Sequence, residues 1–248
     1  MQNLHKEPLG GGMEIFVTDS YHFTTDTILL AHFSNRRGGR RRIDLGAGCG
    51  TIGLLWLKEN RSLEVTAVEI QTDACELLSQ SVRLNGLGQH LSILNADLRE
   101  LRGRLPFGTF DVVACNPPYK LCGTGVPNPE DKKLLARHET ACTLNDICTA
   151  ASNLLQFGGR FCLCQRPERL PDVMEAMRAA SVEPKTLRLV QQRRDKAPKL
   201  FLMEGRKGGK RGYMETLPTL FIENDEGGFS DEMRRIYGNY KSDHEETL

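Results

Sequence analysis

The sequence lacks both long apolar runs and a large excess of charge of either sign. Its apolar runs stay well below the ~20 residues needed to span a bilayer, and its amino-terminal segment MQNLHKEPLGGG lacks the apolar stretch of a secretory signal. The formal net charge is +1, so overall charge gives no general attraction to nucleic acids or acidic membranes. We therefore expect a cytoplasmic protein whose partners are recognised by local features.

Cysteine is present eight times, but no C-x-x-C pair occurs. An even number of cysteines can indicate disulfides in a short secreted chain, whereas this chain has 248 residues and no secretion signal. Cys162 and Cys164 alternate along an expected strand and so face the same way, as small buried apolar residues do. We expect reduced thiols and no metal site.

Strands and helices alternate from about residue 40 onward. Expected strands cover 42–45, 63–68, 91–95, 110–115, 160–165, 185–191, 200–204 and 217–223, and expected helices cover 51–60, 73–85, 143–155 and 170–180. This alternation predicts a mostly parallel sheet with helices on both faces. We expect an N-terminal extension over 1–25, with a possible hairpin, one domain over 26–224 and a polar, peripheral tail over 225–248.

A glycine-rich loop follows the first of these strands, in the segment DLGAGCGTIGLLWL. Gly46, Gly48 and Gly50 stand between strand and helix, where glycine lets the backbone approach a ligand and the helix start offers free N–H donors. Gly48, Gly50 and Gly53 also satisfy the dinucleotide pattern G-x-G-x-x-G. That pattern alone does not separate NAD from other cofactors that carry adenosine.

Three carboxylates around this loop favour a cationic cofactor. Glu69 ends the second strand, where it can accept hydrogen bonds from both ribose hydroxyls, and Asp97 follows the third strand, where it can accept from an adenine amino group. Asp44 precedes the loop, where its charge would oppose a pyrophosphate but would favour a sulfonium or an ammonium. These positions favour S-adenosylmethionine (SAM) over NAD.

The order and spacing of Asp44, the glycines, Glu69 and Asp97 resemble those of the class I SAM-dependent methyltransferases, over most of residues 23–205. The resemblance implies an α/β fold with a Rossmann-like, seven-stranded, mostly parallel sheet. It also implies one antiparallel strand near an edge of that sheet, helices on both of its faces, and SAM as cofactor.

The expected strand 110–115 runs directly into Asn116, Pro117, Pro118 and Tyr119. The carboxyl ends of strands are where ligands of α/β sheets bind. The Asn116 side-chain oxygen and the Pro117 carbonyl can accept from both N–H bonds of an amine, the prolines stiffen the turn, and Tyr119 can stack on a planar base. Gripping both N–H bonds can aim the nitrogen lone pair at a sulfonium methyl group, which is catalysis by orientation and electrostatics.

The Asn-Pro-Pro-Tyr sequence resembles the motif of methyltransferases that act on adenine N6, guanine N2 or a glutamine amide. It predicts Asn116, Pro117, Pro118 and Tyr119 as catalytic residues, and it leaves the three acceptors open. A SAM-sensing, RNA-binding module without turnover is the non-enzymatic alternative, which the intact motif disfavours.

Four further segments resemble the bacterial valine-tRNA adenine-N6 methyltransferases: HFTTDTILLAHF, LLARHE, GGRFCLCQRPERL and LFLMEGRKGGKRG. The resemblance implies methylation of adenine 37 in that tRNA. It implies that Thr25 and Asp26, which lead into a helix over the cofactor, bind SAM together with Asp44, Gly46, Gly48, Gly50, Glu69, Asp97 and Asn116. Guanine-N2 methylation of ribosomal RNA and glutamine-N5 methylation of a release factor are the alternatives. Release-factor enzymes usually carry a helical N-terminal domain, which the residues before Thr25 cannot hold.

Local positive charge supports tRNA as the partner. The stretch 185–211 carries ten basic residues and two acidic ones, and its glycines suggest a flexible loop that follows an RNA backbone. A second basic cluster comprises Arg36, Arg37, Arg40, Arg41 and Arg42. The sequence indicates neither the oligomeric state nor the role of His138 and Glu139.

Overall fold

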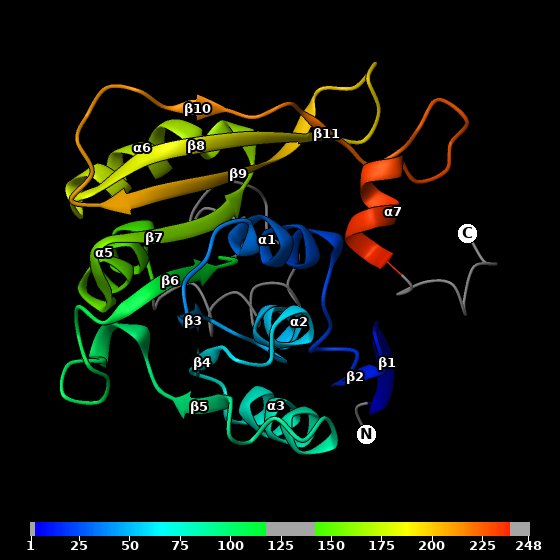
Figure 1. Cartoon of the computed structure of the whole chain (residues 1–248), viewed down its shortest axis with the longest axis vertical. Coiled ribbons are helices and arrows are strands. Elements are labelled where there is room, and N and C mark those ends of the chain that lie inside the picture. Colours follow the sequence, from blue (N-terminus) through cyan, green and yellow to red (C-terminus); the bar gives the residue numbers. More distant parts are fainter. Residues whose placement is uncertain (1–2, 118–141, 239–248) are drawn as a thin grey trace, which may run out of the picture.

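The computed structural model describes residues 3–117 and 142–238 (Figure 1). Pro118, Tyr119, His138 and Glu139 lie outside the described residues. The described helices are α1 (Thr25–Asn35), α2 (Thr51–Glu59), α3 (Thr72–Leu84), α5 (Leu144–Leu154), α6 (Leu170–Ala179) and α7 (Asp231–Tyr237). The described strands are β1 (His5–Gly10), β2 (Met13–Val17), β3 (Arg41–Leu45), β4 (Glu64–Glu69), β5 (Leu91–Asn95), β6 (Phe110–Cys115), β7 (Leu155–Gln165), β8 (Val182–Gln191), β9 (Pro198–Lys207), β10 (Glu215–Thr216) and β11 (Leu220–Phe221).

The main sheet has seven long strands in the order β8-β9-β7-β6-β3-β4-β5. Strand β9 runs antiparallel to β7 and β8, whereas the other neighbouring pairs are parallel. The short strands β10 and β11 both pair with β8 and bring the described sheet to nine strands. This confirms the predicted Rossmann-like class I fold, with two short strands more than expected.

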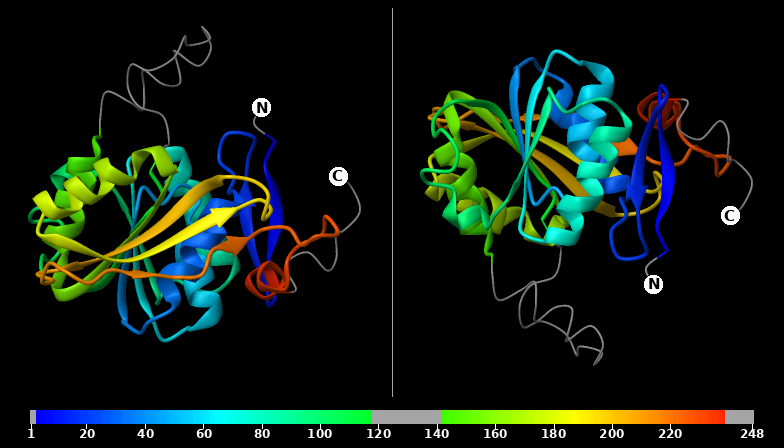
Figure 2. Two further views of the ribbon diagram at one scale, coloured as in Figure 1. Left: turned by 90° about the horizontal axis from the view of Figure 1, so that it is seen from above. Right: turned by 90° about the horizontal axis from the view of Figure 1, so that it is seen from below.

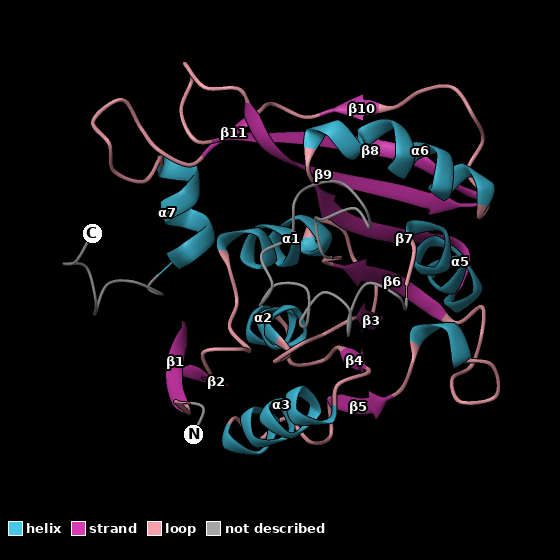
Figure 3. Cartoon of the chain, turned by 180° about the vertical axis from the view of Figure 1, so that it is seen from behind, coloured by secondary structure: helices cyan, strands magenta, loops and turns pink. Residues whose placement is uncertain are grey.

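Helices cover both faces of the sheet (Figures 1 and 3). On one face, apolar side chains of α1, α2 and α3 form a core centred on Trp56, which is fully buried. On the other face, α5 and α6 pack over β6, β7 and β9 around Phe161 and Phe201. Because both faces are covered, the central strands are apolar on both sides, as a parallel sheet requires.

Segments near both ends of the described chain contribute side chains to the α1–α3 core. Strands β1 and β2 form an antiparallel hairpin that places Ile15 in the core, and Phe16 N donates to Ser81 Oγ of α3 at 2.9 Å. Helix α7 buries Met233 and Tyr237, which lie one turn apart on one face. Figure 2 shows the hairpin and α7 on the same side of the molecule in both views.

Strands β7 and β9 are longer than expected. Helix α5 ends at Leu154 and β7 begins at Leu155, so Gly158 and Gly159 lie inside a strand that was expected to begin at residue 160. A Cβ at Gly159 would lie 2.9 Å from the Gln156 carbonyl oxygen, and this close packing explains the glycine there. Likewise, β9 continues to Lys207 and includes Gly205, so the glycine-rich basic loop is shorter than expected.

The strand register brings the expected site to one edge of the sheet. Leu45 pairs with Val68 on one side and with Cys115 on the other, and Cys115 pairs with Leu163. The carboxyl ends of β3, β4, β6 and β7 therefore lie side by side. We call this the carboxyl edge, and the opposite end of the same strands the amino edge.

Candidate functional site

The glycine loop leaves the carboxyl end of β3 with positive φ angles at Gly46, Gly48 and Gly50. A Cβ at Gly50 would lie 2.1 Å from Leu78 Cδ1, so this glycine is required for the packing of α3 against the loop. A Cβ at Gly46 or Gly48 would meet no atom of the described residues within 4 Å. Their bare backbone therefore borders open space that a ligand can approach.

Asp44 lies next to this loop and is 1% exposed. Neither of its carboxylate oxygens has a hydrogen-bond partner among the described residues. Burial, followed by the nearby Glu69 charge, raises the pKa of the Asp44 carboxyl to about 8. A buried carboxylate without a partner is costly, and a ligand that brings a cation or N–H donors would supply what the protein lacks. SAM, which carries a sulfonium and an ammonium group, fits this requirement.

Glu69 ends β4 and fastens the glycine loop to that strand. Its Oε2 accepts from Gly48 N at 2.8 Å, and its Oε1 accepts from Gln71 N at 2.9 Å. Each carboxylate oxygen has a second lone pair, so the expected hydrogen bonds from ribose hydroxyls remain compatible with these contacts. These two backbone contacts hold the Glu69 carboxylate in place, and the same contacts hold the glycine loop that a cofactor would approach.

Asp97 is occupied by a neighbour in a way that sequence reasoning did not anticipate. Its carboxylate accepts from Arg99 N at 2.9 Å, from Arg99 Nε at 3.0 Å and from Arg99 Nη2 at 2.5 Å. The hydrogen bonds from Arg99 hold the pKa of Asp97 below its usual value. An adenine amino group would have to share this carboxylate with Arg99, so the role of Asp97 in cofactor binding stays a prediction.

Asn116 follows β6 directly, and neighbours on two other elements hold its side-chain amide. Asn116 Nδ2 donates to Thr27 Oγ1 of α1 at 3.0 Å, and Asn116 Oδ1 accepts from Cys164 Sγ of β7 at 2.9 Å. The two contacts fix which way the amide oxygen points. Because Cys115 pairs with Leu163, the next position on β7 is Cys164, which places the thiol beside the amide.

Sequence reasoning missed both Thr27 and Cys164. Thr27 stands in the segment HFTTDTILLAHF, whose resemblance directed attention to Thr25 and Asp26 instead. The structure shows the Thr25 hydroxyl 2.9 Å from the Tyr237 hydroxyl of α7, and it places Asp26 beside a cavity with Arg166. Cofactor binding by Thr25 and Asp26 stays a prediction.

The second basic cluster is divided between buried and exposed arginines. Arg42 is buried, donating to Asn35 Oδ1 at 2.6 Å and to the Gly39 carbonyl at 2.9 Å, and burial lowers its pKa to about 10. Arg40 and Arg41 are more exposed and both pair with Glu64. The cluster leads into the amino edge of β3, at the opposite end of the sheet from Asn116, and its contact with RNA stays a prediction.

The stretch 185–211 divides between the two edges because it forms the antiparallel pair β8 and β9. Gln191 pairs with Pro198, so the connecting turn with Arg193, Arg194 and Lys196 lies at the carboxyl edge. Val182 pairs with Lys207, so the basic residues that follow β9 lie at the amino edge. Only the middle of the stretch, around the β8–β9 turn, is therefore placed at the same edge as Asn116.

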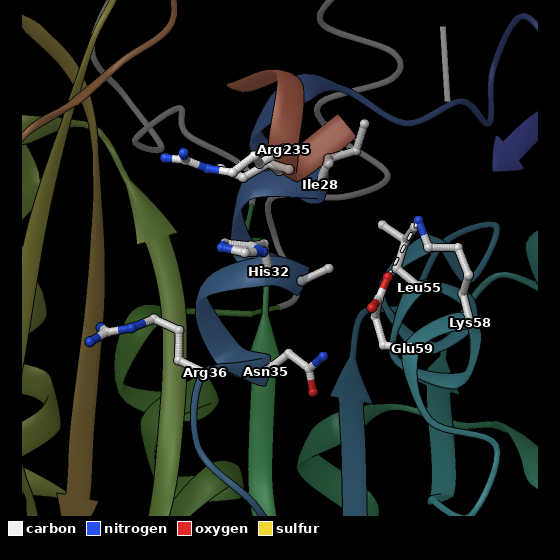
Figure 4. Close-up of a pocket in the computed structure, with 10 residues that line it drawn as sticks. Ile28, His32, Asn35, Arg36, Leu55, Lys58, Glu59 and Arg235 are labelled. Carbon is white, nitrogen blue, oxygen red and sulfur yellow. Dashed lines mark ion pairs between the residues drawn. The ribbon is translucent and has the colours of Figure 1, made fainter. Parts of the chain in front are cut away.

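A second cavity of about 230 Å³ lies between α1, α2 and α7. Figure 4 shows His32, Arg36 and Arg235 extending to one side of α1, whereas Lys58 and Glu59 form an ion pair on α2. Burial lowers the pKa of His32. These groups lie over the face of the sheet that α1 and α2 cover, away from the carboxyl edge.

The described residues contain no cluster of three or more histidine, cysteine or acidic side chains able to hold a metal ion. Among the helices in these same ranges, none has the length and apolar character needed to cross a membrane.

Comparisons with known proteins agree with this geometry. A family model described as methyltransferase small domain matches residues 13–180. A curated tRNA1(Val) (adenine(37)-N6)-methyltransferase from Tolumonas auensis is 24% identical over 180 residues, which cover 72% of this chain and 73% of that protein. A protein of the same name from Parabacteroides distasonis is 25% identical over 182 residues, covering 73% and 74%.

Among solved structures, a predicted O-methyltransferase from Agrobacterium tumefaciens superimposes with a TM-score of 0.68 at 23% identity, covering 87% of this chain and 97% of that one. This likeness supports the fold. Together with the family model, which spans well over half of the chain, these observations show that the chain belongs to the methyltransferase small domain family and is a SAM-dependent methyltransferase.

Proposed function

We propose that this enzyme transfers the methyl group of SAM to the exocyclic N6 amine of an unpaired adenine in tRNA, with adenine 37 of a valine tRNA as the first candidate. The observation that carries the proposal is the fixed amide of Asn116 at the carboxyl edge, next to the glycine loop. The names of the curated relatives support the choice of acceptor.

Bound SAM supplies an electrophilic methyl group on a positively charged sulfur. Gly46 and Gly48 leave the space that the cofactor needs, Glu69 fixes their loop and remains able to accept from ribose hydroxyls, and Asp44 offers a buried negative charge. None of these residues reacts. Their part is to bind and orient the cofactor at the end of the sheet where Asn116 projects.

Asn116 orients the acceptor amine. Its Oδ1 accepts from the Cys164 thiol, and we expect the same oxygen to accept from one N–H of the substrate amine. The Pro117 carbonyl is the expected acceptor for the other N–H. An exocyclic amine is a poor nucleophile because its lone pair is delocalised into the ring. Acceptors that grip both N–H bonds counter this delocalisation and stabilise the positive charge that develops on nitrogen in the transition state.

The proposal is tested with isotopically labelled SAM and unmodified tRNA transcripts, followed by nuclease digestion and mass spectrometry of the nucleosides. Labelled N6-methyladenosine, mapped by ribonuclease fragments to the loop base, is the expected result. Labelled N2-methylguanosine in ribosomal RNA would instead identify guanine N2 as the acceptor, and label in a protein glutamine would identify a glutamine amide. The absence of transfer to any of them would favour a SAM-sensing module.

Asn116→Ala supplies the control for mechanism. Loss of one preorganised acceptor is expected to reduce kcat by about 10²–10³-fold, whereas the dissociation constant of SAM should change less than about threefold, the scale of a weak contact. Normal turnover of this variant would exclude the assigned role of the amide.

A further inference from the structure

A cavity of about 260 Å³ opens at the carboxyl edge between the first turn of α1, the end of β7 and the β8–β9 turn. Its polar lining comes from Thr25, Asp26, Arg166, Gln192 and Lys199. Its apolar lining comes from Val190 of β8, Leu200 of β9 and Ile222, which directly follows β11. The cavity is thus a hollow with a polar wall at the edge where ligands of this fold bind.

Two residues of the cavity lining stand close in sequence to the neighbours of the Asn116 amide. Asp26 directly precedes Thr27, which accepts from Asn116 Nδ2. Arg166 stands two residues after Cys164, which donates to Asn116 Oδ1. We therefore expect the backbone of an RNA strand whose base amine reaches Asn116 to pass near this cavity.

The charges of the cavity suit a singly charged phosphodiester. Arg166 and Lys199 contribute two cations, and both side chains belong to exposed residues. Gln192 adds an amide donor, and Asp26 is the one carboxylate among the lining residues. Arginine and lysine together are the usual means by which proteins hold RNA phosphates.

Neighbouring cations of the β8–β9 turn are partly neutralised within the turn. Asp195 pairs with Arg193 at 3.3 Å and with Lys196 at 3.5 Å, and Glu223 lies 4.0 Å from Arg193. Arg194 stacks over the Phe221 ring, with 5.5 Å from its guanidinium carbon to the ring centroid. Asp195, Glu223 and Phe221 thus engage cations within the turn itself.

We propose that this cavity binds a backbone phosphate of the RNA strand next to the methylated nucleotide, with Arg166 and Lys199 as its donors. The inference rests on the proposed function, because it takes RNA as the substrate. It narrows the expected RNA contact from the whole stretch 185–211 to the carboxyl edge, and it adds Arg166, which lies outside that stretch.

The test uses the full chain and an unmodified anticodon stem-loop oligoribonucleotide of a valine tRNA. The double variant Arg166→Gln/Lys199→Gln removes both cations. The matched control Lys210→Gln/Arg211→Gln removes the same charge at the amino edge, from two exposed residues. Binding is measured by fluorescence anisotropy at several salt concentrations, SAM binding by calorimetry, and methyl transfer with labelled SAM.

We expect the cavity variant to bind the oligonucleotide about ten- to thirtyfold more weakly, with the salt-dependence slope reduced by about 1–2, since each phosphate contact contributes roughly one unit. Its KM for RNA should rise, while kcat at saturating RNA and SAM affinity stay within about threefold of wild type, the scale of a small coupling effect. The control should lose much less affinity.

Asp26→Asn adds an independent test. Loss of the one carboxylate in the cavity lining should strengthen RNA binding. RNA affinity that stays the same or falls would count against the phosphate assignment, whatever happens to SAM affinity.

The outcomes separate the two proposals. Methylation of RNA with equal losses in the cavity variant and the control overturns the phosphate site and leaves the function standing. RNA binding that depends on Arg166 and Lys199 without methyl transfer keeps the site and overturns the function. Absence of oligonucleotide binding by the wild-type chain overturns the phosphate site.

Discussion

Cys164 donates its thiol hydrogen to Asn116 Oδ1 across 2.9 Å, from the strand adjacent to the one that presents the amide. Cys164 is fully buried, so its thiol has no competing solvent. We regard it as a positioning residue, because it acts through Asn116 and not on the substrate.

Cys164→Ala should lower kcat about three- to tenfold, the scale of one weak hydrogen bond, and leave the KM for SAM unchanged. Cys164→Ser keeps a donor and should restore most of the rate. Cys162→Ala is the matched control, because Cys162 is equally buried on the same face of β7. Steady-state kinetics that show the same loss in both alanine variants would reduce the role of Cys164 to packing.

Thr27 provides the second contact of the Asn116 amide. Two replacements of Thr27 distinguish the effect of its hydroxyl from the effect of its side-chain volume. Thr27→Val keeps the branched side chain and removes the acceptor for Asn116 Nδ2, so we expect a loss of kcat of about tenfold from a mispositioned amide. Thr27→Ser keeps the hydroxyl and should retain most activity. Equal rates in the valine and serine variants would contradict a role in orientation.

Asp44 should make the cofactor-free protein less stable as the pH rises. Its folded-state pKa of about 8 lies above the value of about 4 for an exposed aspartate, so between these values the folded chain holds a proton that the unfolded chain has released. The contribution of this group to the free energy of unfolding is therefore largest below about pH 4 and falls until about pH 8.

Asp44→Asn should remove this decline and, at pH 8, raise the free energy of unfolding by about 1–3 kcal/mol, because a neutral amide costs less to bury without a partner than an ionised carboxylate does. The same change should weaken SAM binding at least about tenfold, since it removes a charge-assisted contact. Urea unfolding at several pH values and calorimetry check both parts, with the exposed Asp225→Asn as control. Parallel pH profiles for wild type and Asp44→Asn would refute the assignment.

The buried ion pair between Arg160 and Glu204 predicts a large stability effect. The two groups lie 3.0 Å apart, and their side chains are 5% and 3% exposed. Glu204→Gln would leave the Arg160 guanidinium buried without its counter-charge, so we expect a loss of about 3–5 kcal/mol. Asp172→Asn breaks the more exposed pair with Arg169 and should cost less than about 1 kcal/mol. Similar urea midpoints for the two variants would contradict this ranking.

The fold could be predicted from the sequence because its signals are local. Alternating apolar segments gave the strands and helices, and the glycines after β3 marked the ligand loop. Helix α7 was missed because only Met233 and Tyr237 turn inward in an otherwise polar tail. Their spacing of one helical turn was the available signal.

The site could be predicted only in part, because its remaining contacts join residues far apart in the chain. Thr27 and Asn116 are separated by 89 positions. The pairing of Arg40 and Arg41 with Glu64 likewise joins residues more than 20 positions apart. Composition cannot show such pairing, nor can it show that an antiparallel strand sends half of a basic stretch to the far edge.

The contact between Tyr237 and Thr25 joins the last described helix to the first. Thr27, two residues beyond Thr25, lies against the amide of Asn116. During synthesis, β3, β4 and β6 leave the ribosome well before α7 does. The glycine loop and the amide can therefore assemble first, while α1 receives its support from α7 only when the chain has been made past Tyr237. We therefore expect α1, and with it the contact of Thr27 with Asn116, to reach full stability only after α7 has been synthesised.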